Sequence, residues 1–141
     1  MIMADVAETV RTAGRAKARV IRSAIDVEKM MRPRLKFETQ EEVYAIMLNH
    51  ASKVIDIHFV GLGTDSSAPV SIKHIVRWAL DDLATAVILM HTHPSGSTLP
   101  SRQDDKITLD LKNALQYFEI CLLDHVIIGD GYYSYNDNGR I

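Results

Sequence analysis

Several stretches of the chain show the apolar patterns that predict β-strands, either alternating with polar residues or forming short continuous runs. A turn of four residues, 49–52, lies between the first two predicted strands, which favours a hairpin. The third is fully apolar, as expected for a strand in the middle of a sheet that is covered on both faces. The predicted strands are 43–48, 54–60, 86–90, 120–128 and 132–135.

Three further stretches have apolar residues at the three- to four-residue spacing of helices. Residues 4–30 predict a first helix, although Gly14 weakens its middle and Pro33 marks a boundary soon after its end. Ser71 predicts the N-cap of a second helix, and residues 101–117 predict a third. We therefore expect an α/β fold, with a single mixed β-sheet flanked by helices on both faces.

Composition agrees with one compact domain. The chain has 141 residues, of which 47% are hydrophobic and 24% charged, too apolar for a disordered protein. Every continuous apolar run is far shorter than the roughly 20 residues of a membrane span, so no membrane span and no membrane partner are expected. Cys121 is the only cysteine and excludes an intrachain disulfide, which makes a cytoplasmic location the simplest prediction. The oligomeric state does not follow from the sequence.

Charge is unevenly distributed. Residues 1–36 hold nine Lys or Arg against four Asp or Glu, a net +5, and the remaining residues hold seven against fourteen, a net −7. A basic helical segment of this kind either presents a solvated face or makes weak contact with nucleic acid. We therefore divide the chain into an N-terminal basic helical segment, 1–36, and a main domain, 37–141.

Candidate chemistry begins where the third predicted strand ends. His91 and His93 are two residues apart, so in extended backbone both side chains point to the same face. Asp104 begins the next predicted helix and can reach them if the intervening 94–100 loop folds back. Two imidazoles and one carboxylate suit Zn²⁺, with the fourth position left to water as in catalytic sites. The pattern predicts a site for one zinc ion.

A hydrolytic zinc site also needs a group that takes and returns a proton. Glu42 directly precedes the first predicted strand, and a carboxylate at that place can point into a half-buried cleft. Alternatively, Glu42 is a solvated residue at the start of a strand, as we expect for Glu41.

The other members of the pattern have structural alternatives too. A His-x-His pair often binds no metal, and Ser101-x-x-Asp104 has the form of a helix capping box, a role only partly compatible with metal binding. Asp105 competes with Asp104, but helical neighbours point about 100° apart, so only one can face the metal. The four remaining histidines are expected to be surface or structural residues: His50, His58, His74 and His125.

These residues together resemble the JAB/MPN (JAMM) metalloprotease domain, and more closely its RadC-like branch. The run of residues 88–96, Ile-Leu-Met-His-Thr-His-Pro-Ser-Gly, is similar to the RadC signature, with Thr92 where Asn is usual. The 100–104 segment matches the end of that signature, and residues 123–134 are also RadC-like. The likeness covers about residues 37–138.

The resemblance implies the JAB/MPN fold, which shares the cytidine-deaminase-like architecture, and a zinc-dependent hydrolase acting on peptide or isopeptide bonds of a peptide or protein substrate. His91, His93 and Asp104 would be the zinc ligands and Glu42 the general acid/base. Ser101 would support the oxyanion. Thr92 is expected to point away from the metal.

Two other functions are considered. RadC proteins are associated by name with DNA repair, which suggests a nucleic-acid-linked module whose metal site is not catalytic. Typical members carry a helix-hairpin-helix region before this domain, and we expect no such module within residues 1–36. A zinc nucleobase deaminase would need His-x-Glu and Pro-Cys-x-x-Cys motifs, which are missing here.

Overall fold

A computed structural model describes residues 19–63 and 70–141. Arg11, Arg15 and Lys17, the first basic residues of the N-terminal segment, lie outside the described residues, as does Gly14. The described chain forms three α-helices, a short 3₁₀ helix and five strands. In chain order they are α2 (Ala24–Met31), η1 (Arg32–Arg34), β1 (Glu41–Leu48), β2 (Val54–Gly63), α3 (Ile72–Asp81), β3 (Ala86–Thr92), α4 (Arg102–Gln116), β4 (Cys121–Ile128) and β5 (Tyr132–Ser134).

The five strands form one mixed sheet in the order β2-β1-β3-β4-β5. Strands β1 and β2 form the expected hairpin, and β1 pairs with β3 in antiparallel register. Strands β3 and β4 are parallel, because α4 carries the chain back across the sheet between them. β3 is the central strand and is buried almost throughout, as its apolar sequence predicts.

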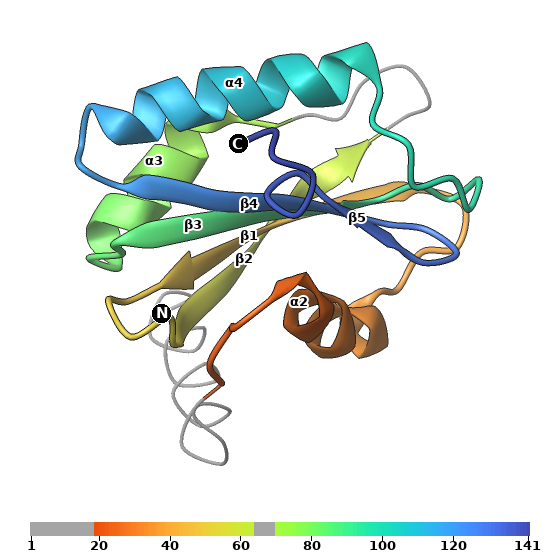
Figure 1. The fold of residues 1–141 in the computed structure, drawn as a ribbon, viewed down its shortest axis with the longest axis horizontal. Coiled ribbons are helices and arrows are strands. Elements are labelled where there is room, and N and C mark those ends of the chain that lie inside the picture. The colour runs from red at the N-terminus through yellow and green to blue at the C-terminus, as the bar shows by residue number, and fades with distance from the viewer. Residues whose placement is uncertain (1–18, 64–69) are drawn as a thin grey trace.

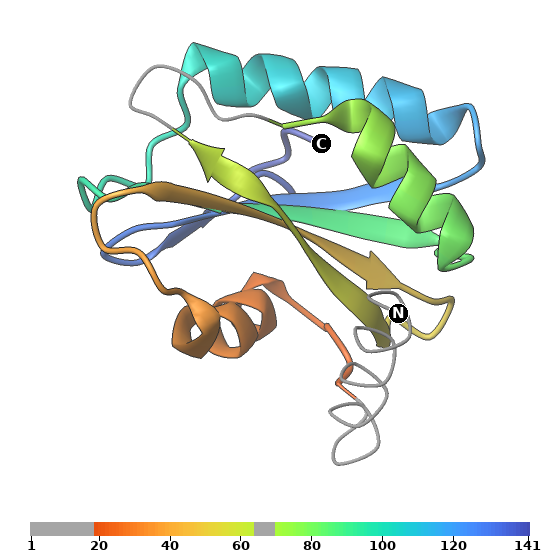
Figure 2. The same cartoon turned by 180° about the vertical axis from the view of Figure 1, so that it is seen from behind.

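Helices cover both faces of the sheet, which confirms the predicted fold class (Figures 1 and 2). Helix α2 packs on one face, against β1 residues that include Tyr44, Ile46 and Leu48. Helices α3 and α4 pack on the other, where Val43 and Ala45 of β1 are buried. Successive residues of β1 thus enter two different cores, which we call the α2 face and the α4 face.

The N-terminal part differs from the single helix predicted over residues 4–30. Within its described portion, Val20 forms a β-bridge with Lys53 and the helix begins only at Ala24. The side chain of Asp26 accepts hydrogen bonds from the backbone N–H groups of Arg22 and Ser23, at 2.8 and 3.2 Å. This capping arrangement starts the helix, because it satisfies donors that have no partner inside it.

Three strands are longer than the pattern predicts. β1 begins at Glu41 instead of Val43. His91 and Thr92 belong to β3 rather than to the following loop, and β2 continues through Gly63. Ser71 is the N-cap of α3 as predicted, and the helix ends at Asp81, before Leu83, which has a positive φ of 54°. Within the described residues, no helix has the length and apolarity needed to cross a membrane.

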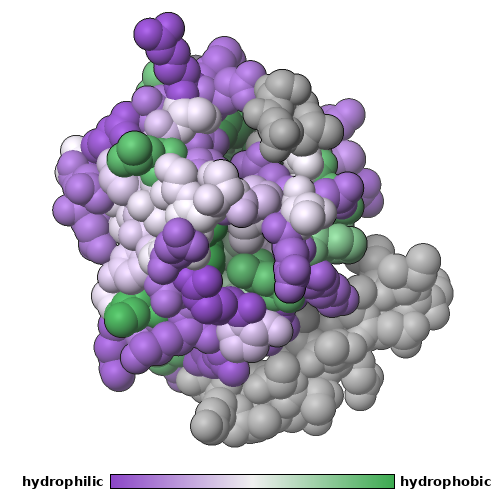
Figure 3. Space-filling view, turned by 90° about the vertical axis from the view of Figure 1, so that its right-hand side faces the viewer, coloured by the Kyte–Doolittle hydropathy of each residue, from purple (hydrophilic) through white to green (hydrophobic). Residues whose placement is uncertain are grey.

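Figure 3 views the end of the molecule where residues 93–100 and the β4–β5 turn lie. Among the coloured residues of this face, hydrophilic side chains predominate and apolar ones form separate small groups.

Candidate metal centre

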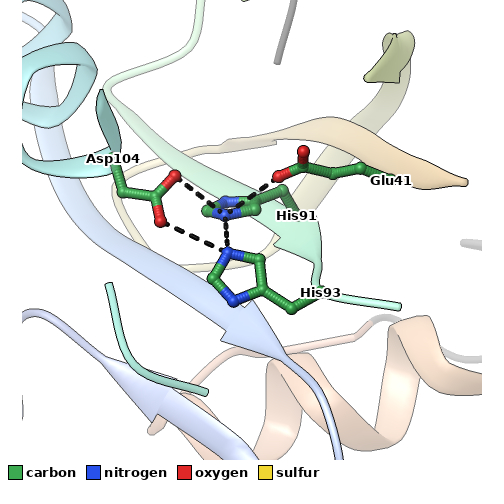
Figure 4. A group of neighbouring side chains, drawn as sticks. All are labelled: Glu41, His91, His93 and Asp104. Carbon is green, nitrogen blue, oxygen red and sulfur yellow. Dashed lines mark hydrogen bonds and ion pairs between the residues drawn. The ribbon is translucent and has the colours of Figure 1, made fainter. Parts of the chain in front are cut away.

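Four side chains from three elements point toward one another on the α4 face (Figure 4). His91 lies near the end of β3 and His93 directly follows that strand, while Asp104 comes from the first turn of α4 and Glu41 is the first residue of β1. Each offers one metal-ligating atom, and these atoms all lie within 4.8 Å of one another. The structure thus brings together the three predicted ligands and a glutamate that differs from the predicted one.

The spacing of the donor atoms matches a small metal site. His91 Nε2 lies 3.0 Å from His93 Nε2 and 3.1 Å from Asp104 Oδ1. His93 Nε2 lies 3.3 Å from Asp104 Oδ2. With metal–ligand bonds of about 2.0–2.1 Å, the donors of a tetrahedral zinc site are separated by roughly 3.3 Å. The three side chains therefore surround a space of the right size for such an ion.

The loop after β3 orients the ring of His93. Nδ1 of His93 lies 3.1 Å from the backbone oxygen of Ser97. A carbonyl oxygen only accepts hydrogen bonds, so Nδ1 carries the proton. Nε2 of the neutral ring then has a lone pair, which points at the cluster.

Two glycines let this loop close against the β4–β5 turn. Gly96 has a φ of +88°, and a Cβ there would lie 2.6 Å from the carboxylate of Asp130. A Cβ on Gly129 would lie 2.4 Å from the backbone oxygen of Gly96 and 2.7 Å from that of Ser97. Close approach of the two backbones thus holds the Ser97 carbonyl in place beside His93.

A buried chain of hydrogen bonds orients the ring of His91. Thr108 donates its hydroxyl proton to the backbone oxygen of Asp104 at 2.6 Å, so its Oγ1 accepts from His125 Nδ1, also at 2.6 Å. Burial lowers the pKa of His125 well below its ordinary value, which keeps that ring neutral. Nε2 of His125 must then accept from His91 Nδ1, at 2.7 Å. His91 is left with its Nε2 lone pair facing the cluster.

This donor set fits a metal cation. Both Nε2 atoms offer lone pairs, and the Asp104 carboxylate faces them. The hydrogen bond with Asp104 raises the pKa of His93, while bonds to His91 and His93 outweigh burial and lower the pKa of Asp104. A metal ion would therefore compete with the proton that the histidines share with Asp104. The residues that would hold the ion are His91, His93 and Asp104.

Ser101 and Asp104 also form the capping box that their spacing predicts. Asp104 N–H donates to Ser101 Oγ at 3.0 Å, and Ser101 N–H donates to Asp104 Oδ2 at 2.8 Å. The carboxylate has enough lone pairs to cap α4 and still face both histidines, so capping does not turn it away from them. Asp105 points elsewhere, and its Oδ1 accepts from Tyr135 at 2.7 Å.

Glu42 does not face the histidines, which corrects the expectation for this residue. Its side chain is fully buried on the α2 face, where it accepts hydrogen bonds from the backbone N–H groups of Lys36 and Phe37 at 3.0 and 3.1 Å. Tyr44 donates its hydroxyl to Glu42 Oε1 at 2.8 Å. Thr92 points to the α2 face as expected, and its Oγ1 accepts from Glu42 N–H at 2.9 Å.

Glu41 occupies the place expected for Glu42. Its Oε1 lies 3.3 Å from His91 Nε2, and its side chain is 15% exposed. The reason is the alternation of β1. Val43 pairs with His91, and residues opposite each other in neighbouring strands point to the same face. Glu41, two residues before Val43, shares that face, whereas Glu42 shares the face of Tyr44.

Comparison with known proteins agrees with this geometry. Residues 21–140 match the family model described as "RadC-like JAB domain". The chain belongs to the RadC-like JAB domain family. The chain has 36% identity over 118 residues to the "UPF0758 protein" of Streptococcus gordonii, an alignment that covers 83% of this chain and 52% of that protein.

Two further relatives show the same partial coverage. The "UPF0758 protein" of Chlorobium phaeovibrioides is 37% identical over 124 residues, 87% of this chain and 56% of the relative. The one from Streptococcus equi subsp. zooepidemicus is 32% identical over 140 residues, 99% of this chain and 62% of the relative. The chain thus spans about half to three fifths of the length of these relatives.

Within this RadC-like JAB domain, sequence reasoning missed Glu41, Thr108 and the role of His125. His125 was expected to be a structural or surface histidine, and it is a buried structural one that contacts the ring of His91. Its position at the core of an apolar strand, 34 residues after His91, was the available signal. Ser101 lies at the N-cap of α4, and its oxyanion role stays a prediction.

Proposed function

We propose that this chain is a zinc-dependent hydrolase that cleaves a peptide or isopeptide bond in a peptide or protein substrate. Membership of the RadC-like JAB domain family supports the proposal. The single observation that carries it is the convergence of two histidine Nε2 atoms and the Asp104 carboxylate beside Glu41. In this proposal His91, His93 and Asp104 hold the ion. A bound zinc ion supplies Lewis acidity, which activates water and polarises a carbonyl group.

Glu41 is proposed as the general acid/base. Its carboxylate faces the cluster from the first residue of β1 and is partly open to solvent. A carboxylate so placed can take a proton from the attacking water and return it to the leaving amine. Glu42 cannot share this task, because its two oxygens are engaged on the opposite face of the sheet.

Ser101 is proposed to stabilise the oxyanion that develops on the substrate carbonyl. Its Oγ accepts the Asp104 N–H, and its own hydroxyl proton is a donor at the edge of the cluster. Ser101→Ala would remove this donor while keeping the Asp104 contact with Ser101 N–H. We expect a larger fall in kcat than in zinc affinity from this substitution.

The test is an assay of zinc-loaded protein against a panel of peptides and isopeptide-linked conjugates. We expect cleavage that a chelator abolishes and zinc restores. Glu41→Gln should lower kcat/KM by about 10²–10⁴-fold with unchanged zinc stoichiometry. Glu38→Gln, at an exposed glutamate three residues earlier, is the matched control and should leave the rate unchanged. Equal rates for the Glu41→Gln and native proteins would contradict the mechanism.

The nucleic-acid alternative stays a prediction, as does the cytoplasmic location. Arg19 and Arg22 of the basic segment are exposed, but Arg11, Arg15 and Lys17 lie outside the described residues. Duplex binding that falls steeply with salt, and that is lost when these five residues are neutralised, would support it.

A further inference from the structure

A second histidine–carboxylate cluster lies beside β2, an edge strand of the sheet. Asp56 and His58 belong to β2, and Asp82 is the C-cap residue of α3. His58 Nε2 lies 2.8 Å from Asp82 Oδ2 and 3.4 Å from Asp56 Oδ2. The three ligating atoms all lie within 4.8 Å of one another.

The fold places these residues for the same reason that it places the first cluster. Asp56 and His58 are two residues apart on a strand, so both side chains point to one face. They pair with Met47 and Ala45 of β1, which are buried on the α4 face. Helix α3 packs on that face and ends at Asp81, which places the C-cap residue Asp82 beside them.

The contacts leave one donor between two acceptors. Nε2 of His58 carries at most one proton, and the shorter contact directs it to Asp82. The Asp56 side chain is nine-tenths buried, and its Oδ2 is aimed at the same nitrogen from 3.4 Å, beyond ordinary hydrogen-bond length. Burial raises the pKa of Asp56, and the negative charge of Asp82 adds to that rise. A buried carboxylate thus faces a second one across a single imidazole.

A divalent cation would satisfy all three groups at once. Two carboxylates and a neutral imidazole carry a charge of −2, which one such ion neutralises. The two contacts of His58 Nε2, at 2.8 and 3.4 Å, bracket the roughly 3.3 Å that separates the donors of a tetrahedral site with zinc-like bond lengths. The three side chains are 10–19% exposed, so an ion can reach them from solvent.

We propose that Asp56, His58 and Asp82 form a second divalent-cation site, of zinc type, distinct from the site at His91. The two cannot share an ion, because β1 lies between β2 and β3 and separates their backbones by about 10 Å. A cation here would tie the edge strand β2 to the end of α3. The proposal does not depend on hydrolytic activity.

Trp78 provides a local reporter for this site. It is the only tryptophan in the chain, and its ring stacks on His58 with centroids 4.6 Å apart and planes 2° apart. Metal binding at His58 changes the charge and position of the stacked imidazole. It should therefore change the fluorescence of Trp78.

The experiment is a calorimetric zinc titration of the full chain after its metal has been removed with a chelator. We expect two equivalents for the native protein, and one for the His91→Ala/His93→Ala variant. Asp82→Asn should also bind one equivalent, because the amide cannot supply the charge. His74→Gln is the matched control, since His74 also lies against Trp78, with ring centroids 5.9 Å apart, but is outside the cluster. It should bind two.

The fluorescence of Trp78 shows which of the two sites binds each equivalent of zinc. Zinc should change the emission of Trp78 in the His91→Ala/His93→Ala variant and leave it unchanged in Asp82→Asn. Two results would overturn the proposal: no zinc binding by the His91→Ala/His93→Ala variant, or two equivalents retained by Asp82→Asn. If the native protein binds a single equivalent and only the His91→Ala/His93→Ala variant loses it, the second site is ruled out and the site at His91 is supported. If Asp82→Asn does not fold, the titration of the first variant alone decides.

Discussion

The two faces of β1 at its start carry adjacent glutamates in opposite settings. Glu41, on the α4 face, lies at the rim of a cluster of metal-ligating side chains and is partly exposed. Glu42, on the α2 face, is fully buried, and its carboxylate accepts two backbone N–H groups and the hydroxyl of Tyr44. Neighbouring residues of the same type thus take different roles, because a strand turns alternate side chains to opposite faces.

The two faces of β1 therefore serve different purposes: the α2 face contributes to stability and the α4 face to the candidate chemistry. On the α2 face the hydrogen bonds of the carboxylate are satisfied, so the group anchors the segment before β1. On the α4 face, two histidine Nε2 atoms and the carboxylates of Asp104 and Glu41 converge, with ligating atoms within 4.8 Å of one another. We therefore expect changes on the α2 face to alter folding, and changes on the α4 face to alter metal binding.

The largest expected effect comes from truncating the two glutamates separately. Glu42→Ala leaves a buried hydroxyl and two N–H groups without their acceptor and should lower the free energy of unfolding by roughly 3 kcal/mol. Glu41→Ala should change it by less than about 0.5 kcal/mol. Urea denaturation of both metal-free variants measures the difference. Equal losses would show that the two faces do not differ as described.

Replacing His125 should weaken metal binding on the α4 face. His125→Leu removes the acceptor that fixes the ring of His91, and loss of such a partner typically lowers metal affinity about 10–100-fold. Competition with a chromophoric chelator measures the zinc dissociation constant. His125→Gln, which retains an acceptor, should recover part of the affinity. A purely structural His125 would lower stability in both variants without this difference in affinity.

Gly129→Ala tests whether the loop after β3 orients the ring of His93. The added methyl group would meet the backbone oxygens of Gly96 and Ser97, and the loop must shift. We expect zinc affinity to fall several-fold, less than for His125→Leu, because the loop can shift while the ring of His93 stays at the cluster. Gly131→Ala is the control, since a Cβ there meets no atom within 4 Å. Equal affinities of the two variants would contradict this role for the loop.

The smallest effect concerns titration on the α2 face. Burial and the hydrogen bond to Glu42 raise the pKa of Tyr44 from 10.0 to about 12. The unfolded chain releases this proton near pH 10, so the contribution of Tyr44 to stability is complete below pH 10 and is lost as the pH rises through 12. Glu42→Gln should move the pKa back toward 10. Phenolate absorbance, with Tyr44→Phe as reference, follows the shift.

Much of the fold follows from local patterns. The capping box of Ser101 and Asp104 marks the start of α4, and the continuous apolar run of β3 marks the central strand. The common face of His91 and His93 also follows from their spacing, because residues two apart along a strand point to one face.

Local patterns could not show which of the two glutamates faces His91. Both Glu41 and Glu42 precede the same apolar run, and only the strand register and the position of α4 decide which one faces His91. The role of His125 also depends on parallel pairing between β3 and β4, in which residues distant in the chain become neighbours. Local patterns contain neither kind of information.

The most direct test of the metal centre is a crystal structure of the zinc-loaded protein, with diffraction data collected at the zinc absorption edge. The account predicts an anomalous peak bonded to His91 Nε2, His93 Nε2 and the Asp104 carboxylate, with Glu41 facing it and Glu42 turned to the α2 face. An ion held by other residues, or Glu42 in the place of Glu41, would contradict it.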